Sequence, residues 1–262
     1  MTNYYQHATW VALLFFQCIL SVGIAQKNTG IHSHNDYEQR IPFWGAFSAG
    51  AKSIEADVFL VEGKLFVAHE EENILPERTL ETVYLLPLQR ANQMYGQESL
   101  DFQLMIDVKS EAYTSLKAIV ELLEKYKSYL KPYNKTGVSI IISGNRPHET
   151  DYANYPDFIL FDCQDISGMP EQMWPKVAMI STSFRNFSKW NGKEGISEKD
   201  EKKVNGFVEA ARKFSKPIRF WATPDTENAW DQLISWGVNY INTDKPEEVQ
   251  AYLKKKVPSQ HR

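Results

Sequence analysis

Two acidic side chains at alternate positions stand out in the strand-like segment 53–60, which reads SIEADVFL. On a β-strand, Glu55 and Asp57 would point to the same face, because side chains two residues apart share a face. Two carboxylates this close repel each other unless a cation lies between them, and such oxygen ligands suit hard ions, Ca²⁺ or Mg²⁺. Acidic pairs are also common on solvated strands, so the pair indicates a metal site only together with its surroundings.

Histidines end the two neighbouring apolar segments. His32 and His34 end the first and are followed by Asn35, and His69 directly follows the second, 64–68. A histidine has a pKa near neutrality, so it can accept or donate a proton at working pH. A single histidine is more often a hydrogen-bonded loop residue than a catalyst. The combination of these histidines with the acidic pair favours a catalytic site.

Several segments together resemble a known superfamily, that of the glycerophosphodiester phosphodiesterases and phosphatidylinositol-specific phospholipases C. The opening segments are HSHND at 32–36, GAKSIEADV at 50–58 and LFVAHE at 65–70, and the later ones are LMIDVK at 104–109, FWATP at 220–224 and GVNYINTDKP at 237–246. The similarity spans residues 31–250, with His-Ser-His-Asn-Asp-Tyr in place of the family's usual His-Arg-Gly. It implies a metal-dependent phosphoric diester hydrolase that acts on a glycerophosphodiester or a phospholipid headgroup.

The resemblance also assigns ligands. It implies that one divalent cation, Ca²⁺ or Mg²⁺, is held by Glu55, Asp57 and Asp107. It implies substrate contacts from Asn35, Lys109 and Trp221, with Asn242 near the same end of the fold. An internal ion pair is the alternative for Asp107 with Lys109, and core packing is the alternative for Trp221.

The same resemblance makes His32 and His69 the general acid–base pair, in which one takes the proton of the attacking hydroxyl and the other protonates the leaving group. His34 is either the catalytic histidine in place of His32 or a residue that supports it. The arginine of His-Arg-Gly is missing, so either Arg40 compensates for it or the substrate preference differs.

Strand-like and helix-like segments alternate after residue 30, which predicts an α/β fold of the (β/α)8 TIM-barrel type in a single domain. Function in such a barrel lies at the C-terminal ends of the strands, where the acids and histidines fall. Strands are expected at 30–34, 52–60, 102–109, 138–143, 158–162, 177–181, 218–222 and 238–242, with an extended return at 64–68. Helices are expected at 42–49, 78–95 with a break at Pro87, 111–130, 193–214, 225–236 and 246–255, and irregular structure at 164–176.

Length and composition fit one exported barrel. The chain has 262 residues, 43% of them hydrophobic, and a net charge of −4, which argues against nucleic-acid binding. The apolar run 10–25 predicts a signal peptide at 1–25 and a phosphodiesterase-like domain at 26–262, exported to the periplasm or secreted, with an N-terminal membrane anchor as the alternative. Cys18 falls in that run, which leaves Cys163 as a single, buried cysteine of the mature chain.

Two other functions fit parts of the sequence. A His-x-His pair also opens amidohydrolases and histidinol-phosphatase-like phosphoesterases, but these need later histidine ligands, and only His69, His148 and His261 follow His34. The other alternative is a non-catalytic secreted barrel that binds a lipid headgroup or a glycan. We expect a small phosphodiester or a phospholipid headgroup as partner, with peripheral membrane contact in the latter case; the sequence does not predict an oligomeric state.

Overall fold

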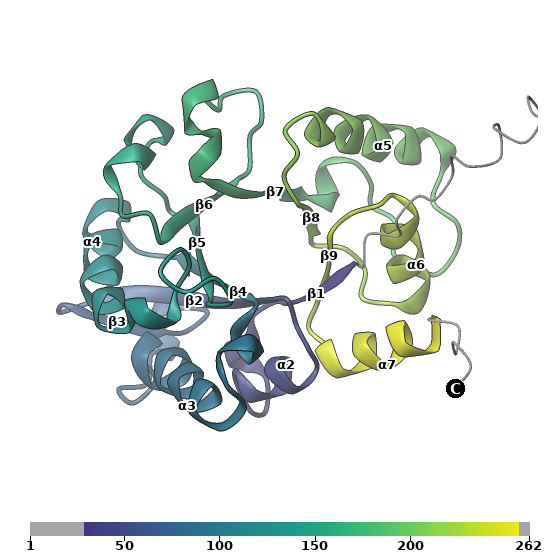
Figure 1. Cartoon of the computed structure of the whole chain (residues 1–262). Coiled ribbons are helices and arrows are strands. Elements are labelled where there is room, and N and C mark those ends of the chain that lie inside the picture. Colours follow the sequence, from purple (N-terminus) through teal and green to yellow (C-terminus); the bar gives the residue numbers. More distant parts are fainter. Residues whose placement is uncertain (1–28, 257–262) are drawn as a thin grey trace, which may run out of the picture.

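The computed structural model describes residues 29–256, so the predicted signal peptide and Cys18 lie outside the described part of the chain and stay predictions. Within that part, eight parallel strands close into a ring with the helices outside it, and a ninth strand runs antiparallel beside one of them (Figure 1). Closure comes from the first strand, which pairs in parallel with both the second and the last. The predicted (β/α)8 barrel is confirmed.

All eight strands of the ring overlap the segments expected from the sequence. They are β1 (Gly30–Ser33), β2 (Ser53–Val61), β4 (Gln103–Val108), β5 (Ser139–Gly144), β6 (Ile159–Cys163), β7 (Val177–Ser183), β8 (Ile218–Trp221) and β9 (Tyr240–Thr243). The antiparallel strand β3 (Lys64–Val67) is the expected extended return, and it pairs with the end of β2.

The helices outside the ring are α2 (Trp44–Ser48), α3 (Leu86–Tyr95), α4 (Ala112–Leu123), α5 (Glu198–Arg212), α6 (Glu227–Ser235) and α7 (Pro246–Lys256). Side chains cap the start of α4 and α5 among them. The Glu111 carboxylate accepts hydrogen bonds from the first backbone N–H groups of α4, and the Ser197 hydroxyl does the same for α5, which therefore starts later than expected. No helix within residues 29–256 is both long and apolar enough to cross a membrane.

The break expected at Pro87 is not found. A π-helical turn, Glu81–Leu85, continues directly into α3, so the hydrogen-bond pattern changes just before the proline and accommodates a residue without an N–H. The irregular structure expected at 164–176 is found, because the chain makes only a 3-10 turn there, Glu171–Lys176. A second 3-10 turn, Glu149–Asn154, stands in place of a helix between β5 and β6.

The ring of strands separates two hydrophobic cores, one inside the barrel and one between the strands and the helices. On β4, Leu104 and Ile106 pack outward into the large core between strands and helices. Met105 points the other way and packs inside the barrel with Ile141 and Met179. Acidic and histidine side chains at inward positions are therefore collected inside the barrel, toward its C-terminal mouth.

A buried carboxylate fixes the loop after β1. Asp36 is fully buried and accepts hydrogen bonds from the Ser33 hydroxyl (2.9 Å), the Phe43 backbone N–H (2.6 Å) and the Tyr84 hydroxyl (3.1 Å). Burial raises the pKa of Asp36, and the hydrogen bonds oppose that rise. The loop that carries His34 is thus tied to the outer core at three points.

Replacing Asp36 with alanine is expected to lower the free energy of unfolding by roughly 2–3 kcal/mol, because a buried N–H and two buried hydroxyls lose their acceptor. Urea unfolding followed by circular dichroism measures the change. Glu38→Ala in the same loop is the control, since Glu38 is exposed, and it should change stability by less than about 0.5 kcal/mol. Equal stability of the two variants would contradict the anchoring role.

Candidate active site

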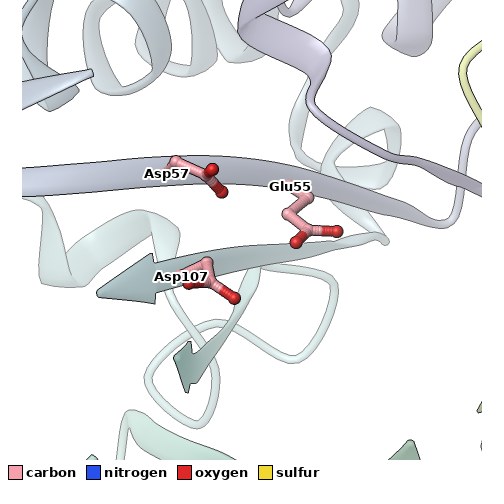
Figure 2. Close-up of side chains that lie close together, drawn as sticks. All are labelled: Glu55, Asp57 and Asp107. Carbon is pink, nitrogen blue, oxygen red and sulfur yellow. The ribbon is translucent and has the colours of Figure 1, made fainter. Parts of the chain in front are cut away.

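Three carboxylates converge at the mouth of the barrel. Asp57 on β2 lies directly opposite Asp107 on β4, and Glu55 lies on the same face of β2. One oxygen of each lies within 4.8 Å of the others, and Figure 2 shows the three side chains gathered between the two strands. The Lys109 ammonium is 3.0 Å from Asp57 Oδ2 and 3.0 Å from Asp107 Oδ1, so it balances part of the negative charge. The structure thus brings together all the predicted metal ligands and Lys109.

Glu55 is held from inside the barrel by two buried side chains. Its Oε2 accepts hydrogen bonds from His32 Nε2 (2.6 Å) and from Arg219 Nη1 (3.0 Å). The same Arg219 nitrogen donates to Asn242 Oδ1 (3.0 Å). Burial opposes ionisation of Glu55, but the Arg219 charge and the His32 hydrogen bond hold the pKa of this carboxyl well below its usual range. Glu55 is therefore ionised and fixed in orientation.

Both ring nitrogens of His32 are engaged inside the barrel. His32 Nδ1 lies 2.6 Å from Ser53 Oγ, which also accepts a hydrogen bond from the Gln103 amide (2.9 Å). His32 Nε2 lies 2.6 Å from Glu55 Oε2 and 2.5 Å from Arg219 Nη1. Burial and the Arg219 charge lower the pKa of His32 to about 4, so the ring is neutral near pH 7.

The donor set fits a hard divalent cation. Asp57 Oδ1 is buried and has no hydrogen-bond partner within residues 29–256. Burial raises the pKa of Asp57, and burial together with the Glu55 and Asp57 charges raises the pKa of Asp107 to about 6 despite Lys109. A cation stabilises the charged forms of crowded carboxylates. Glu55, Asp57 and Asp107 are the residues that would hold it, and both Ca²⁺ and Mg²⁺ accept such oxygens.

His32 on β1 and His34 just after it occupy different environments. The side chain of His32 is 0% exposed, whereas that of His34 is 32% exposed at the mouth. His34 Nδ1 lies 2.8 Å from Asp244 Oδ1, just after β9. Burial lowers the pKa of His34, but the Asp244 hydrogen bond and the Glu55 charge outweigh it, so the pKa is raised. His34 is held through Nδ1, and Nε2 is left for other contacts.

His69 is held by a tyrosine that also contacts the carboxylate cluster. The Tyr37 hydroxyl donates to Asp57 Oδ2 (2.8 Å) and lies 3.1 Å from His69 Nδ1. Because the Tyr37 proton is used on Asp57, its oxygen accepts from His69 Nδ1, and the lone pair of the neutral ring is on Nε2. The His69 side chain is 49% exposed, so this nitrogen is within reach of a substrate.

Gly144 at the end of β5 makes room for Asp107. Its φ of +67° lies in the left-handed region that favours glycine. A Cβ at this position would lie 2.3 Å from Asp107 Oδ1 and 2.5 Å from the Val108 carbonyl oxygen. Any larger residue would therefore displace the Asp107 carboxylate from the cluster.

The other predicted contacts are spread over the mouth and its surroundings. Asn35 is half-buried in the loop after β1, and Trp221 ends β8 with 37% of its surface exposed. Asn242 is buried and bound to Arg219, so it belongs to the support of Glu55. Arg40 is exposed in a separate surface hollow.

Comparison with known families agrees with this geometry. Residues 24–162, more than half of the chain, match the AIM6-like phosphodiesterase domain. The chain belongs to this family. Residues 217–247, which include β8 and β9, match the glycerophosphoryl diester phosphodiesterase family. The resemblance drawn from the opening and closing segments is thereby confirmed.

Relatives of this AIM6-like domain come from fungi. The altered inheritance of mitochondria protein 6 homolog of Arthroderma benhamiae is 27% identical over 260 residues, which cover 85% of this chain and 83% of that protein. The altered inheritance of mitochondria protein 6 of Kluyveromyces lactis is 25% identical over an alignment of 298 positions, which covers 84% of this chain and 71% of that protein. A crystal structure of a glycerophosphodiester phosphodiesterase from Parabacteroides distasonis matches with a TM-score of 0.60 at 16% identity, covering 88% of this chain and 98% of that one, which shows the shared fold.

Several residues of this AIM6-like site were not predicted from the sequence, among them Tyr37, Arg219 and Gly144. Arg219 lies two residues before Trp221, so both face inward on β8, and a charged residue at such a position is a usable signal. Tyr37 belongs to the segment HSHNDY, but its partners come from other strands. Gly144 comes at the end of an apolar strand, and because many strands end in glycine, its position gives no specific signal in the sequence.

Tyr37→Phe keeps the ring and removes the hydroxyl, so it is expected to lower kcat for phosphodiester hydrolysis roughly ten- to hundredfold with a small change in KM. The reason is that His69 and Asp57 lose a shared partner. Steady-state kinetics with a thermal unfolding scan measures it. Tyr252→Phe, which loses a hydroxyl contact to Asp231 on α6, is the matched control and should keep its kcat. A wild-type kcat in Tyr37→Phe would contradict the positioning of His69.

Proposed function

We propose that this chain is a metal-dependent phosphodiesterase that hydrolyses a glycerophosphodiester or the headgroup ester of a phospholipid. The observation that carries the proposal is the cluster of three carboxylates and Lys109 at the barrel mouth, with His34 and His69 beside it. The family match supports the reaction class, and the geometry supports the roles given to individual residues.

Charge is the first requirement of the reaction. A phosphodiester is an anion, and negative charge builds up on its oxygens during attack. The carboxylate cluster would hold a divalent cation, which offsets the charge on a non-bridging phosphate oxygen. Burial lowers the pKa of Lys109, but Asp107 and Asp57 outweigh it and raise the pKa, so the ammonium stays charged beside the cluster.

Two proton transfers are the second requirement. A base accepts the proton of the attacking water or substrate hydroxyl while its oxygen bonds to phosphorus, and an acid gives a proton to the leaving alkoxide as the P–O ester bond breaks. His34 and His69 suit these tasks because each is anchored through Nδ1 and presents Nε2. Attack by a hydroxyl of the substrate itself would give a cyclic phosphate first.

The contacts of His32 and His34 favour His34 as the acid–base catalyst. Both ring nitrogens of His32 are hydrogen-bonded inside the barrel, to Ser53 and to Glu55. We therefore assign His32 the task of positioning Glu55. His34 reaches the mouth, and its Asp244 partner orients the ring in the way that carboxylates orient catalytic histidines.

A histidine-ligated metal hydrolase is less well supported. In the part of the chain that the structure describes, the group suited to a metal consists of carboxylates alone. His32 Nε2, which would have to bind the metal, donates to Glu55 instead. A non-catalytic binding barrel would share these residues, so turnover is the property that separates it from the proposal.

Purified protein is expected to hydrolyse at least one member of a panel of glycerophosphodiesters in Ca²⁺ or Mg²⁺. EDTA and Glu55→Gln should each lower the rate by roughly a hundredfold or more, since both remove the cation from the phosphate. Asp101→Asn is the matched control, because Asp101 pairs with Lys131 before β4, at the other end of the barrel, and should keep the wild-type rate.

Two results would overturn this proposal. Turnover that continues in EDTA would exclude the dependence on a metal. A folded protein that binds the diesters but turns over none of them with either ion would make the binding barrel the better description.

Substitutions of His32 and of His34 distinguish the roles of the two histidines. His34→Gln is expected to lower kcat by roughly 10²- to 10⁴-fold without lowering Tm. His32→Ala is expected to lower Tm, because it opens a cavity and removes a partner of the buried Glu55 carboxylate. Kinetics and thermal unfolding of both variants measure this. An active His34→Gln beside an inactive His32→Ala of wild-type Tm would reverse the assignment.

A further inference from the structure

A cavity of about 640 Å³ opens beside Lys109. It lies between the loop from β4 to α4, with Ser110 and Ala112, and the loop after β5, with Asn145, Arg146 and Pro147. Because the Lys109 ammonium contacts both Asp57 and Asp107, the cavity adjoins the carboxylate cluster. A diester whose phosphate lies at the cluster can therefore place one of its two alcohol substituents in this cavity.

The wall of the cavity is polar and fixed. No aromatic and no long aliphatic side chain lines it. The Asn145 amide donates to the backbone carbonyls of Lys109 (3.0 Å) and Ser110 (2.9 Å), which ties the two loops together. Acyl chains bind to apolar walls, so this cavity suits a polar headgroup rather than a lipid tail.

The charged side chains of the cavity differ in how the protein engages them. The Glu111 carboxylate accepts from two backbone N–H groups at the start of α4, and Glu149 lies 3.9 Å from His148 at the surface. Lys109 is paired with the cluster. Arg146 differs, because its Nε and Nη1 are buried and have no hydrogen-bond partner within residues 29–256.

The neighbours of Arg146 do not neutralise it. It contacts the hydroxyl of Tyr152, whose ring is stacked on Phe161 at 3.6 Å between centroids. Burial raises the pKa of Tyr152 to about 12 although Arg146 opposes the rise, so this hydroxyl is neutral near pH 7. Arg146 is partly exposed at the cavity wall and keeps its charge there, and the oxygens of a bound anion are good acceptors for such a guanidinium.

We propose that this cavity is the headgroup subsite, and that Arg146 binds an anionic substituent, a phosphomonoester or a carboxylate, on the alcohol of the diester. The inference rests on the proposed phosphodiesterase function and adds a substrate class to it: diesters that carry a second negative charge. The phosphodiester lies at the cluster and Lys109, and the second anion lies at Arg146.

The test compares diesters that differ in headgroup charge. Glycerophosphoinositol 4-phosphate should have a KM at least tenfold below that of glycerophosphoglycerol, whose headgroup is neutral. Arg146→Gln should reduce this ratio by roughly ten- to hundredfold, and Arg146→Lys should reduce it less, because it keeps the charge. Arg185→Gln is the matched control, since Arg185 is an exposed arginine just after β7 and should leave the ratio as it is.

A stability measurement distinguishes anion binding by Arg146 from a purely structural role of this residue. Arg146→Gln removes a guanidinium of which Nε and Nη1 are buried without acceptors, so its Tm should equal or exceed that of the wild type. A lower Tm together with equal losses for both diesters would show that Arg146 supports the fold and would overturn the subsite.

A binding measurement separates this inference from the proposed function. Inositol 1,4-bisphosphate should bind at least tenfold more tightly than inositol 1-phosphate by calorimetry, and Arg146→Gln should abolish the difference, with or without turnover. Equal affinities in the wild type would overturn the subsite even if diesters are hydrolysed. A clear difference in a protein that hydrolyses no diester would keep the subsite and overturn the phosphodiesterase proposal.

Discussion

The mutual repulsion of three carboxylates is the constraint on which the rest of the site depends. Parallel pairing of β2 with β4 puts Asp57 directly opposite Asp107, an arrangement that is unfavourable by itself. Two cationic side chains on opposite sides of the cluster reduce this repulsion. Lys109 neutralises the outer part of the cluster from the mouth, and Arg219 neutralises Glu55 from inside the barrel. The charge that remains is what suits the cluster to a divalent ion.

The support of Glu55 explains why the barrel interior is polar where many barrels are filled with aliphatic side chains. Hydrogen bonds link Tyr240 through Gln103 and Ser53 to His32, and this chain ends at the Glu55 carboxylate. Such a network is favourable in a low dielectric only when every member is paired. The apolar cluster of Met105, Ile141 and Met179 fills the remaining interior space.

The sequence predicted the fold well and the site in part, for a physical reason. Strand periodicity and the spacing of Glu55 and Asp57 are local properties, and local patterns fix the strands and the inward direction of both acids. The difference in burial and contacts between His32 and His34 is not a local property, because it depends on how deep inside the closed barrel each histidine lies. The same holds for Arg219, whose partners come from β1, β2 and β9. Only barrel closure brings these strands together.

The position of Arg219 also decides from which side a substrate can meet positive charge. The opening segment of this chain lacks the arginine of His-Arg-Gly, and Arg219 does not stand in for it, because its Nη1 is engaged with Glu55 and Asn242 and the residue is buried. Arg40 is exposed away from the cluster. Among these groups, Lys109 alone offers a charge at the mouth next to the phosphate position. In the reaction that we propose, phosphate charge would be met on the β4 side, and the loops after β4 and β5 would set the choice of headgroup.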